Sequence, residues 1–297
     1  MPLSPTRDLC DAFAREGYLV VRGLFSPDEV MALRNHVTAL LEPGPGGAPQ
    51  PYVQTAFDAN GAVKLVKASG LAERDPHVRD LVTRPAFVDV VEALLGPGAK
   101  RFRDVLVVKP GRTGGALSYH QDSAYWDVEP KALVSAWIGL GDVSEEASCL
   151  SVVPETHRQE IEHTIYLRGR HRVPQPITRT LRRLVSLAGT GDNPSATGGS
   201  MAVWKAKRWL LAETTKYAPA LFDLQDFRVP PAALEGRREV MLPVKAGDVI
   251  FFHSLLWHAS GPNRTGDTRL AEIISFMGAS ARFVGRGQGS FPLARQA

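Results

Sequence analysis

The chain has 297 residues, 44% hydrophobic and 22% charged, which is typical of a globular protein with one large domain or two small ones. Its net charge of +4 is mild, and no apolar run approaches bilayer length, so a membrane protein is not expected. The first eight residues lack a signal-peptide core, and Cys10 and Cys149 are the only cysteines. We therefore expect a cytoplasmic protein without a disulfide scaffold.

The first hundred residues are expected to be mainly helical. A helix from Leu9 ends at Gly17, and a short buried strand follows over 18–21. Ser26 is a typical N-cap before Pro27, and the next helix carries an apolar stripe formed by Val30, Leu33, Val37 and Leu41. A further helix is predicted over 85–95, ending at Gly96-Pro97-Gly98.

From about residue 101 the pattern changes to short apolar strands. They are predicted over 105–108, 133–140, 240–244, 249–252 and 270–276. Helices followed by strands predict a mainly β, α+β domain whose sheet is an antiparallel sandwich or barrel. We expect a single domain (1–297), with helical support over 1–100, a core over 101–153 and 239–280, and an insertion or lid over 154–238.

The expected insertion begins with a basic stretch. Its arginines are Arg158, Arg168, Arg170, Arg172, Arg179, Arg182 and Arg183. Such a stretch can attract an anionic substrate, a carrier protein or nucleic acid, and it can equally be a solvated helix face. The sequence leaves these alternatives open.

A His-x-Asp triplet, His120-Gln121-Asp122, indicates a metal site. On an extended strand, residues two apart point to the same face, so His120 and Asp122 can supply two ligands together. His258 is the third candidate, and two histidines with one carboxylate form the facial triad of non-haem iron(II) enzymes.

Other histidines compete for these roles. His253 is an alternative distal ligand, but Ser260 and Arg269 are placed correctly for His258 and favour it. His253 is then expected near the site in a structural role. For His157 and His163, at the start of the insertion, surface or capping roles are expected.

A dicarboxylate site is indicated beside the metal ligands. Ser260 shares a face with His258 on extended backbone, and a turn brings Arg269 alongside. Arginine can clamp a carboxylate bidentately while the serine hydroxyl adds a hydrogen bond. Lys109 and Arg103 share one strand face, so they either point into the barrel or reach solvent at the strand ends.

Together these motifs resemble the phytanoyl-CoA dioxygenase family of iron(II)/2-oxoglutarate-dependent oxygenases. The matching segments, in order, are Phe13–Val21, Ser26–Val30, His120–Asp122, Trp137, Cys149–His157, and His258 with Ser260, Asn263 and Arg269. Two departures are Tyr119, where tryptophan is frequent, and the stretch 154–157, which lacks the usual glycine.

The resemblance implies a double-stranded β-helix (jelly roll, cupin-like) and a fixed division of roles. His120, Asp122 and His258 would bind Fe(II), and Arg269, Ser260, Trp137 and Lys109 would bind 2-oxoglutarate. Oxidation of a substrate by O2 would release succinate and CO2, with hydroxylation favoured. Related halogenases carry a small residue at the position of Asp122, so its carboxylate argues against halogenation.

The substrate is expected to be a small molecule, such as a secondary metabolite, that is anionic or carrier-linked. Candidate contacts are Arg103, Leu117, Tyr125 and Trp204. Trp126, Trp204 and Trp209 can wall a pocket or simply belong to the core. We expect a monomer or homodimer with no nucleic-acid or membrane partner. A non-oxygenase cupin-type enzyme such as an isomerase, or a binding protein with a degenerate site, remain as alternatives.

Overall fold

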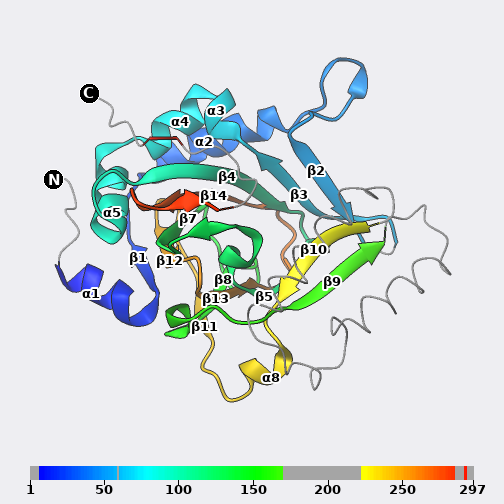
Figure 1. Cartoon of the computed structure of the whole chain (residues 1–297). Helices are drawn as coiled ribbons and strands as arrows, with labels where there is room; N and C mark the ends of the chain where they lie inside the picture. The colour runs from blue at the N-terminus through cyan, green and yellow to red at the C-terminus, as the bar shows by residue number, and fades with distance from the viewer. Residues whose placement is uncertain (1–6, 59, 170–221, 285–290, 293–297) are drawn as a thin grey trace.

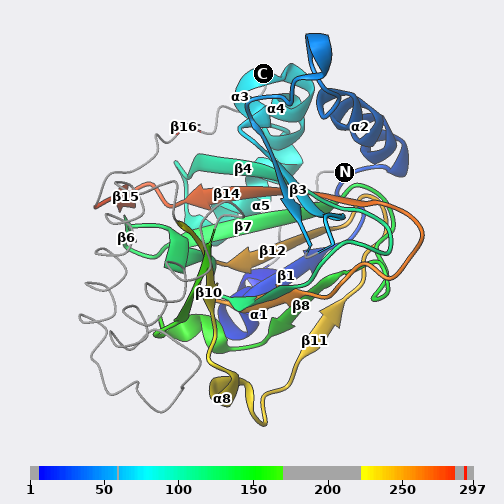
Figure 2. The same ribbon diagram turned by 90° about the vertical axis from the view of Figure 1, so that its right-hand side faces the viewer.

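The computed structural model describes residues 7–58, 60–169, 222–284 and 291–292. Two antiparallel sheets account for most of its strands, and several helices lie together on one side of the larger sheet (Figures 1 and 2). The large sheet has the order β1 (Tyr18–Val21), β12 (Val249–His253), β7 (Leu133–Gly139), β14 (Arg269–Met277), β4 (Lys100–Lys109), β3 (Val63–Ser69) and β2 (Val53–Phe57), and β16 (Phe291–Pro292) also pairs with β4. The small sheet has the order β11 (Val240–Leu242), β8 (Leu150–Val153), β13 (Trp257–Ser260) and β5 (Leu117–His120).

Two further strand pairs lie outside these sheets. They are β9 (Thr164–Gly169) with β10 (Phe222–Arg228), and β6 (Val128–Glu129) with β15 (Arg282–Phe283). Three short 3-10 turns are η1 (Pro45–Gly47), η2 (Asp122–Tyr125) and η3 (Thr156–Arg158). Only the two ends of the expected insertion are described, and they hold η3, β9, β10 and the short helix α8 (Pro231–Leu234).

The N-terminal helices begin and end where local signals predict. Helix α1 (Arg7–Glu16) stops at Gly17, whose φ of +85° favours glycine. Helix α2 (Pro27–Leu40) opens with a full capping box, in which the Ser26 hydroxyl accepts from the Glu29 amide and the Glu29 carboxylate accepts from the Ser26 amide. Helix α5 (Pro85–Leu95) ends at Gly96 as expected. Helices α3 (Leu71–Arg74) and α4 (Pro76–Val82) were not predicted.

The central strands of the large sheet, β4, β7, β12 and β14, are largely buried on both faces, which explains their continuous apolar sequences. In Figures 1 and 2, helices α2, α3 and α4 lie on one side of it and the small sheet on the other. Along β14, Leu270, Ile274 and Phe276 pack in the cluster that includes the helices, while Ala271 packs in the cluster shared with the small sheet. This is the predicted double-stranded β-helix, in which two sheets enclose the space between them.

The first hundred residues contribute more than helical support. Strands β2 and β3, which the sequence pattern did not reveal, extend the large sheet next to β4. No helix within the described ranges is long and apolar enough to span a membrane.

Candidate active site

The metal-ligand candidates meet at a cavity between the two sheets. His258 of β13 lies opposite His120 of β5 in the register of the small sheet. Asp122 follows as the first residue of η2, after an extended Gln121. The prediction that His120 and Asp122 share one strand was therefore wrong for Asp122. The extended residue between them still keeps both side chains on one side.

The three side chains are arranged so that they could hold a metal ion. The Asp122 Oδ1 lies 3.5 Å from both His120 Nε2 and His258 Nε2, and all three ligand atoms lie within 4.8 Å of one another. Each imidazole is oriented by its other nitrogen, since His120 Nδ1 lies 2.8 Å from the Ser118 carbonyl and His258 Nδ1 lies 3.0 Å from the Leu256 carbonyl. Protonated Nδ1 atoms leave both Nε2 lone pairs directed at the same point.

The pKa shifts of His120 and Asp122 favour the protonation states that bind a cation. Burial, followed by the neighbouring His258, lowers the pKa of His120 and so favours its neutral, ligating form. Burial opposes ionisation of Asp122, but His258 and His120 outweigh it and hold the pKa of the carboxyl well below its usual range. A neutral imidazole beside a carboxylate is the protonation state that metal binding requires.

Two serines of the large sheet support Asp122 from behind. The Ser135 hydroxyl donates to Asp122 Oδ2 at 3.0 Å and lies 3.1 Å from the Ser275 hydroxyl. Both serines are fully buried, and they face each other across β7 and β14. They leave Asp122 Oδ1 directed at the histidines. Nothing in the local sequence around these serines indicated this role.

The Gln121 side chain anchors the His120–Asp122 segment through hydrogen bonds to segments that are distant in sequence. Its amide donates to the carbonyls of Gln159 and Leu255, and its Oε1 accepts from the Ile161 amide. His163 lies behind it, 4% exposed, with Nε2 accepting from the Gln121 backbone amide at 3.2 Å. Burial lowers the pKa of His163 to about 3. The expected surface role of His163 was wrong, because the chain after η3 folds back under the ligand triplet.

His253 and His157 lie away from the triad. His253 and His157 have ring centroids 5.6 Å apart, beside the end of α1. The His253 backbone amide donates to the Gly17 carbonyl, and His157 Nε2 lies 3.1 Å from the Ala14 carbonyl. The structure therefore places His258, and not His253, beside His120 and Asp122.

Arg269 enters the same cavity with unused donors. Its Nη2 donates to the Ser148 carbonyl at 3.0 Å, while Nε and Nη1 are buried without a hydrogen-bond partner among the described residues. Burial lowers its pKa to about 10, and its guanidinium carbon lies 5.4 Å from the Trp137 ring centroid. Desolvated guanidinium N–H groups without a partner are suited to donate to the oxygens of a carboxylate. The residues present therefore fit a dicarboxylate beside a metal ion.

Lys109 lies behind this position. Its side chain is fully buried, which excludes the alternative that it reaches solvent. Its Nζ lies 2.6 Å from Ser260 Oγ, 2.8 Å from Ser148 Oγ and 2.8 Å from the Gly261 carbonyl. Burial, and then Arg269, lowers the pKa of Lys109 to about 6. Lys109 is thus placed to orient the Ser260 hydroxyl.

The outer cavity wall combines cationic and aromatic side chains. The predicted residues Arg103, Leu117 and Tyr125 all line it, whereas Trp204 lies outside the described residues. Trp126 both lines the cavity and packs in the core, edge-on to Phe102 and 5.7 Å from the Arg103 guanidinium carbon. Sequence reasoning did not assign several further wall residues to the site, among them Lys67, Phe227 and Arg228.

The basic stretch is only partly described. Arg158 is exposed and lies 3.9 Å from Glu155, while the segment from Arg170 to Arg183 and Trp209 lie outside the described residues. The choice between an anion-binding patch and a solvated face therefore stays open.

Comparisons with known proteins agree with this geometry. The model of the phytanoyl-CoA dioxygenase (PhyH) family matches residues 13–271. Human peroxisomal phytanoyl-CoA dioxygenase is 23% identical over 280 residues, covering 92% of this chain and 68% of the relative. L-proline trans-4-hydroxylase of Streptomyces griseoviridis is 28% identical over 174 residues, covering 57% and 62%.

Solved structures show the same fold at lower identity. EctD from S. alaskensis with 2-oxoglutarate and 5-hydroxyectoine superposes with a TM-score of 0.62 at 20% identity, covering 99% of this chain and 94% of that one. The epimerase SnoN in complex with Fe3+, alpha ketoglutarate and nogalamycin RO gives 0.63 at 19%, covering 98% and 93%. The family match, the paired sheets and the clustered His120, Asp122 and His258 lead to one conclusion: the chain belongs to the phytanoyl-CoA dioxygenase family of iron(II)/2-oxoglutarate-dependent oxygenases.

Proposed function

We propose that this oxygenase hydroxylates a small anionic organic molecule, with His120, Asp122 and His258 as the iron ligands. The observation that carries the proposal concerns Arg269, whose Nε and Nη1 are buried without a partner in the described part of the chain, in the cavity that the three ligand candidates also line. A buried arginine with unused donors is costly unless an anion completes it. A dicarboxylate could bind the metal ion with one end and accept hydrogen bonds from Arg269 with the other.

Each residue then has a defined task in the reaction. Arg269 and Ser260 hold the distal carboxylate of 2-oxoglutarate, and Trp137 limits its position from the side. Lys109 fixes the Ser260 hydroxyl from behind. When bound, iron with 2-oxoglutarate and O2 supplies the oxidising power and releases succinate and CO2. The protein contributes orientation and excludes water from the space between the sheets.

The substrate end of the cavity favours an anion. Lys67 of β3, Arg103 of β4 and Arg228 of β10 all line the wall. Among the described lining residues, Asp122 is the only carboxylate. A cavity lined mainly by cationic side chains raises the local concentration of anionic ligands. Tyr125, Trp126, Phe227 and Leu117 supply the apolar surface that small-molecule sites combine with a few polar groups.

A spectroscopic titration tests the cosubstrate assignment. Iron(II) and 2-oxoglutarate are added anaerobically to the metal-free protein, and a metal-to-cosubstrate charge-transfer band is expected. Arg269→Gln should raise the 2-oxoglutarate concentration needed for the band at least tenfold, and Asp122→Ala should weaken iron binding. The matched control is Arg264→Gln, because Arg264 is exposed. An unchanged titration in Arg269→Gln would contradict the assignment.

A turnover screen tests the reaction and the substrate class. Succinate release is measured with carboxylates, phosphates and neutral compounds of similar size, and coupled loss of an anionic compound is expected. Substrate conversion without succinate would instead support a cupin-type isomerase. Arg103→Met should raise KM for the anionic substrate without changing the 2-oxoglutarate titration. A cytoplasmic location and a monomeric or dimeric state remain predictions.

A further inference from the structure

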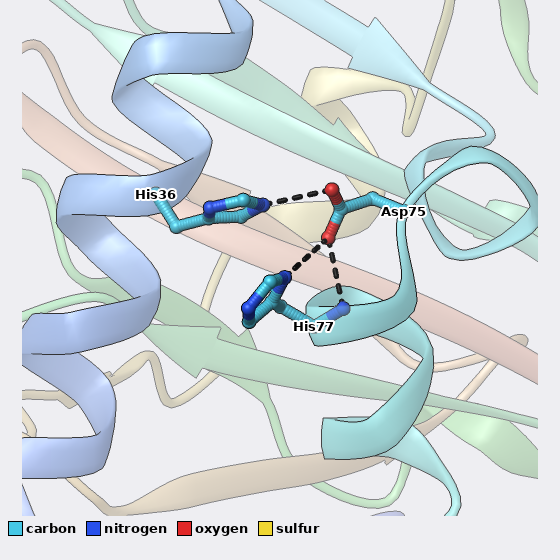
Figure 3. A group of neighbouring side chains, drawn as sticks. All are labelled: His36, Asp75 and His77. Carbon is cyan, nitrogen blue, oxygen red and sulfur yellow. Dashed lines mark hydrogen bonds and ion pairs between the residues drawn. The ribbon is translucent and has the colours of Figure 1, made fainter.

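A second cluster of two imidazoles and one carboxylate lies far from the cavity, between helices α2 and α4. His36 is on α2, Asp75 directly precedes α4, and His77 is in the first turn of α4. One potential ligand atom from each residue lies within 4.8 Å of the other two. Figure 3 shows both rings directed at the same carboxylate. The cluster is on the helical side of the large sheet, so the catalytic triad does not use it.

The contacts within this cluster are close and specific. His36 Nε2 lies 2.7 Å from Asp75 Oδ2, and His77 Nδ1 lies 3.6 Å from Asp75 Oδ1 (Figure 3). The two imidazole centroids are 4.2 Å apart. Both rings can therefore approach one cation held at the Asp75 carboxylate.

The two oxygens of Asp75 have different tasks. Oδ1 accepts from the backbone amides of His77 and Val78 at 2.9 and 3.2 Å and thereby caps α4. Oδ2 points to His36 instead. One oxygen can therefore bind a cation while the other keeps the helix capped.

The spacing suits a borderline divalent cation. Zn2+ binds nitrogen and oxygen ligands at about 2.1 Å, which separates tetrahedral ligand atoms by about 3.4 Å. The 2.7 Å contact between His36 and Asp75 would have to open by about 0.7 Å, a change within reach of small side-chain rotations. The His77 side chain is 66% exposed, so a water molecule can fill the remaining coordination position.

We propose that His36, Asp75 and His77 form a second divalent-cation site that binds Zn2+ and clamps α2 to the start of α4. Imidazole ligands favour zinc over Mg2+ or Ca2+, which prefer all-oxygen sites. The site joins residues 39 positions apart, so a bound ion should stabilise the packing of the helical layer. It is independent of the oxygenase reaction.

The test uses the full chain with the catalytic ligands removed. In His120→Ala/His258→Ala protein, calorimetry with ZnCl2 at neutral pH should show one Zn2+ per chain, and Tm should rise by a few degrees at saturation. His36→Ala and His77→Ala should each weaken Zn2+ binding at least tenfold. Asp75→Asn should do the same, and because asparagine is also a good N-cap, it keeps α4 intact.

The control is His157→Ala in the same background, a histidine beside α1 that should leave Zn2+ binding unchanged. Co2+ should give visible absorption bands whose loss follows the same variants. Absence of stoichiometric Zn2+ binding in the double-alanine protein would overturn the proposal. So would unchanged affinity in a folded Asp75→Asn protein, since Asp75 would then only cap α4 and pair with His36.

Discussion

Glu272 offers a quantitative test of how the large sheet tolerates a buried charge. It lies in the middle of β14 between Leu270 and Ile274, faces the helical layer and is 1% exposed. Neither carboxyl oxygen has a hydrogen-bond partner among the described residues. Burial first, and then the nearby Asp104, raises the pKa of Glu272 well above its usual range, against the opposing effect of Arg101 and Arg103. The shift favours the neutral form of Glu272 in the folded protein.

The sign and size of the effect follow from proton linkage. Above the unfolded pKa of about 4.3, the unfolded chain releases this proton while the folded chain keeps it. The free energy of unfolding thus falls by about 1.4 kcal/mol per pH unit until the folded group ionises. Between about pH 5 and about pH 7 the loss is up to about 2.7 kcal/mol. Glu272→Met also removes two unsatisfied oxygens, which adds about 1–3 kcal/mol of stability.

Urea denaturation at several pH values measures this directly. Glu272→Gln should be less sensitive to pH than the wild type, because it cannot titrate, and Glu272→Met should be more stable at every pH. Glu235→Gln is the matched control, because Glu235 directly follows α8 and is exposed, and it should follow the wild type. A difference between wild type and Glu272→Gln that stays constant from about pH 5 to about pH 7 would refute the reasoning.

Three further predictions concern the site and its surroundings. Ser135→Ala should weaken iron(II) binding about 10- to 100-fold, because Asp122 loses its supporting hydroxyl, as an anaerobic iron titration would show. Lys109→Met should raise KM for 2-oxoglutarate about tenfold with a smaller effect on kcat, because the Ser260 hydroxyl loses the hydrogen bond from Lys109. Succinate release measures both constants, and equal KM values in variant and wild type would contradict this prediction. Glu155→Gly should stabilise the fold by up to about 1 kcal/mol in urea denaturation, because Glu155 has a φ of +66°, which glycine adopts without strain; a lower free energy of unfolding would disprove it.

The sequence was sufficient where the determining interactions are local or chemically distinctive. Gly17, Ser26 and Gly96 mark helix ends because caps act within one turn. The candidate metal ligands could also be identified from the sequence, because His120, Asp122 and His258 occur in a characteristic order with Arg269. The pairing of the strands that carry the site was harder to predict from the sequence. His258 pairs with His120 across 138 positions of chain, a pairing that no local pattern specifies.

Tertiary structure alone decided what surrounds those residues. Strands β2 and β3, with weak alternation of their own, are held in place by β4, and they bring Lys67 to the cavity wall. His163 is buried because the chain after η3 folds under Gln121, and Glu272 faces the helices because its neighbours on β14 must alternate across a doubly buried sheet. The sequence by itself determined which side chains can hold iron and a dicarboxylate. The packing of two sheets determined which other side chains complete the site, since contacts between distant segments exist only once the sheets close.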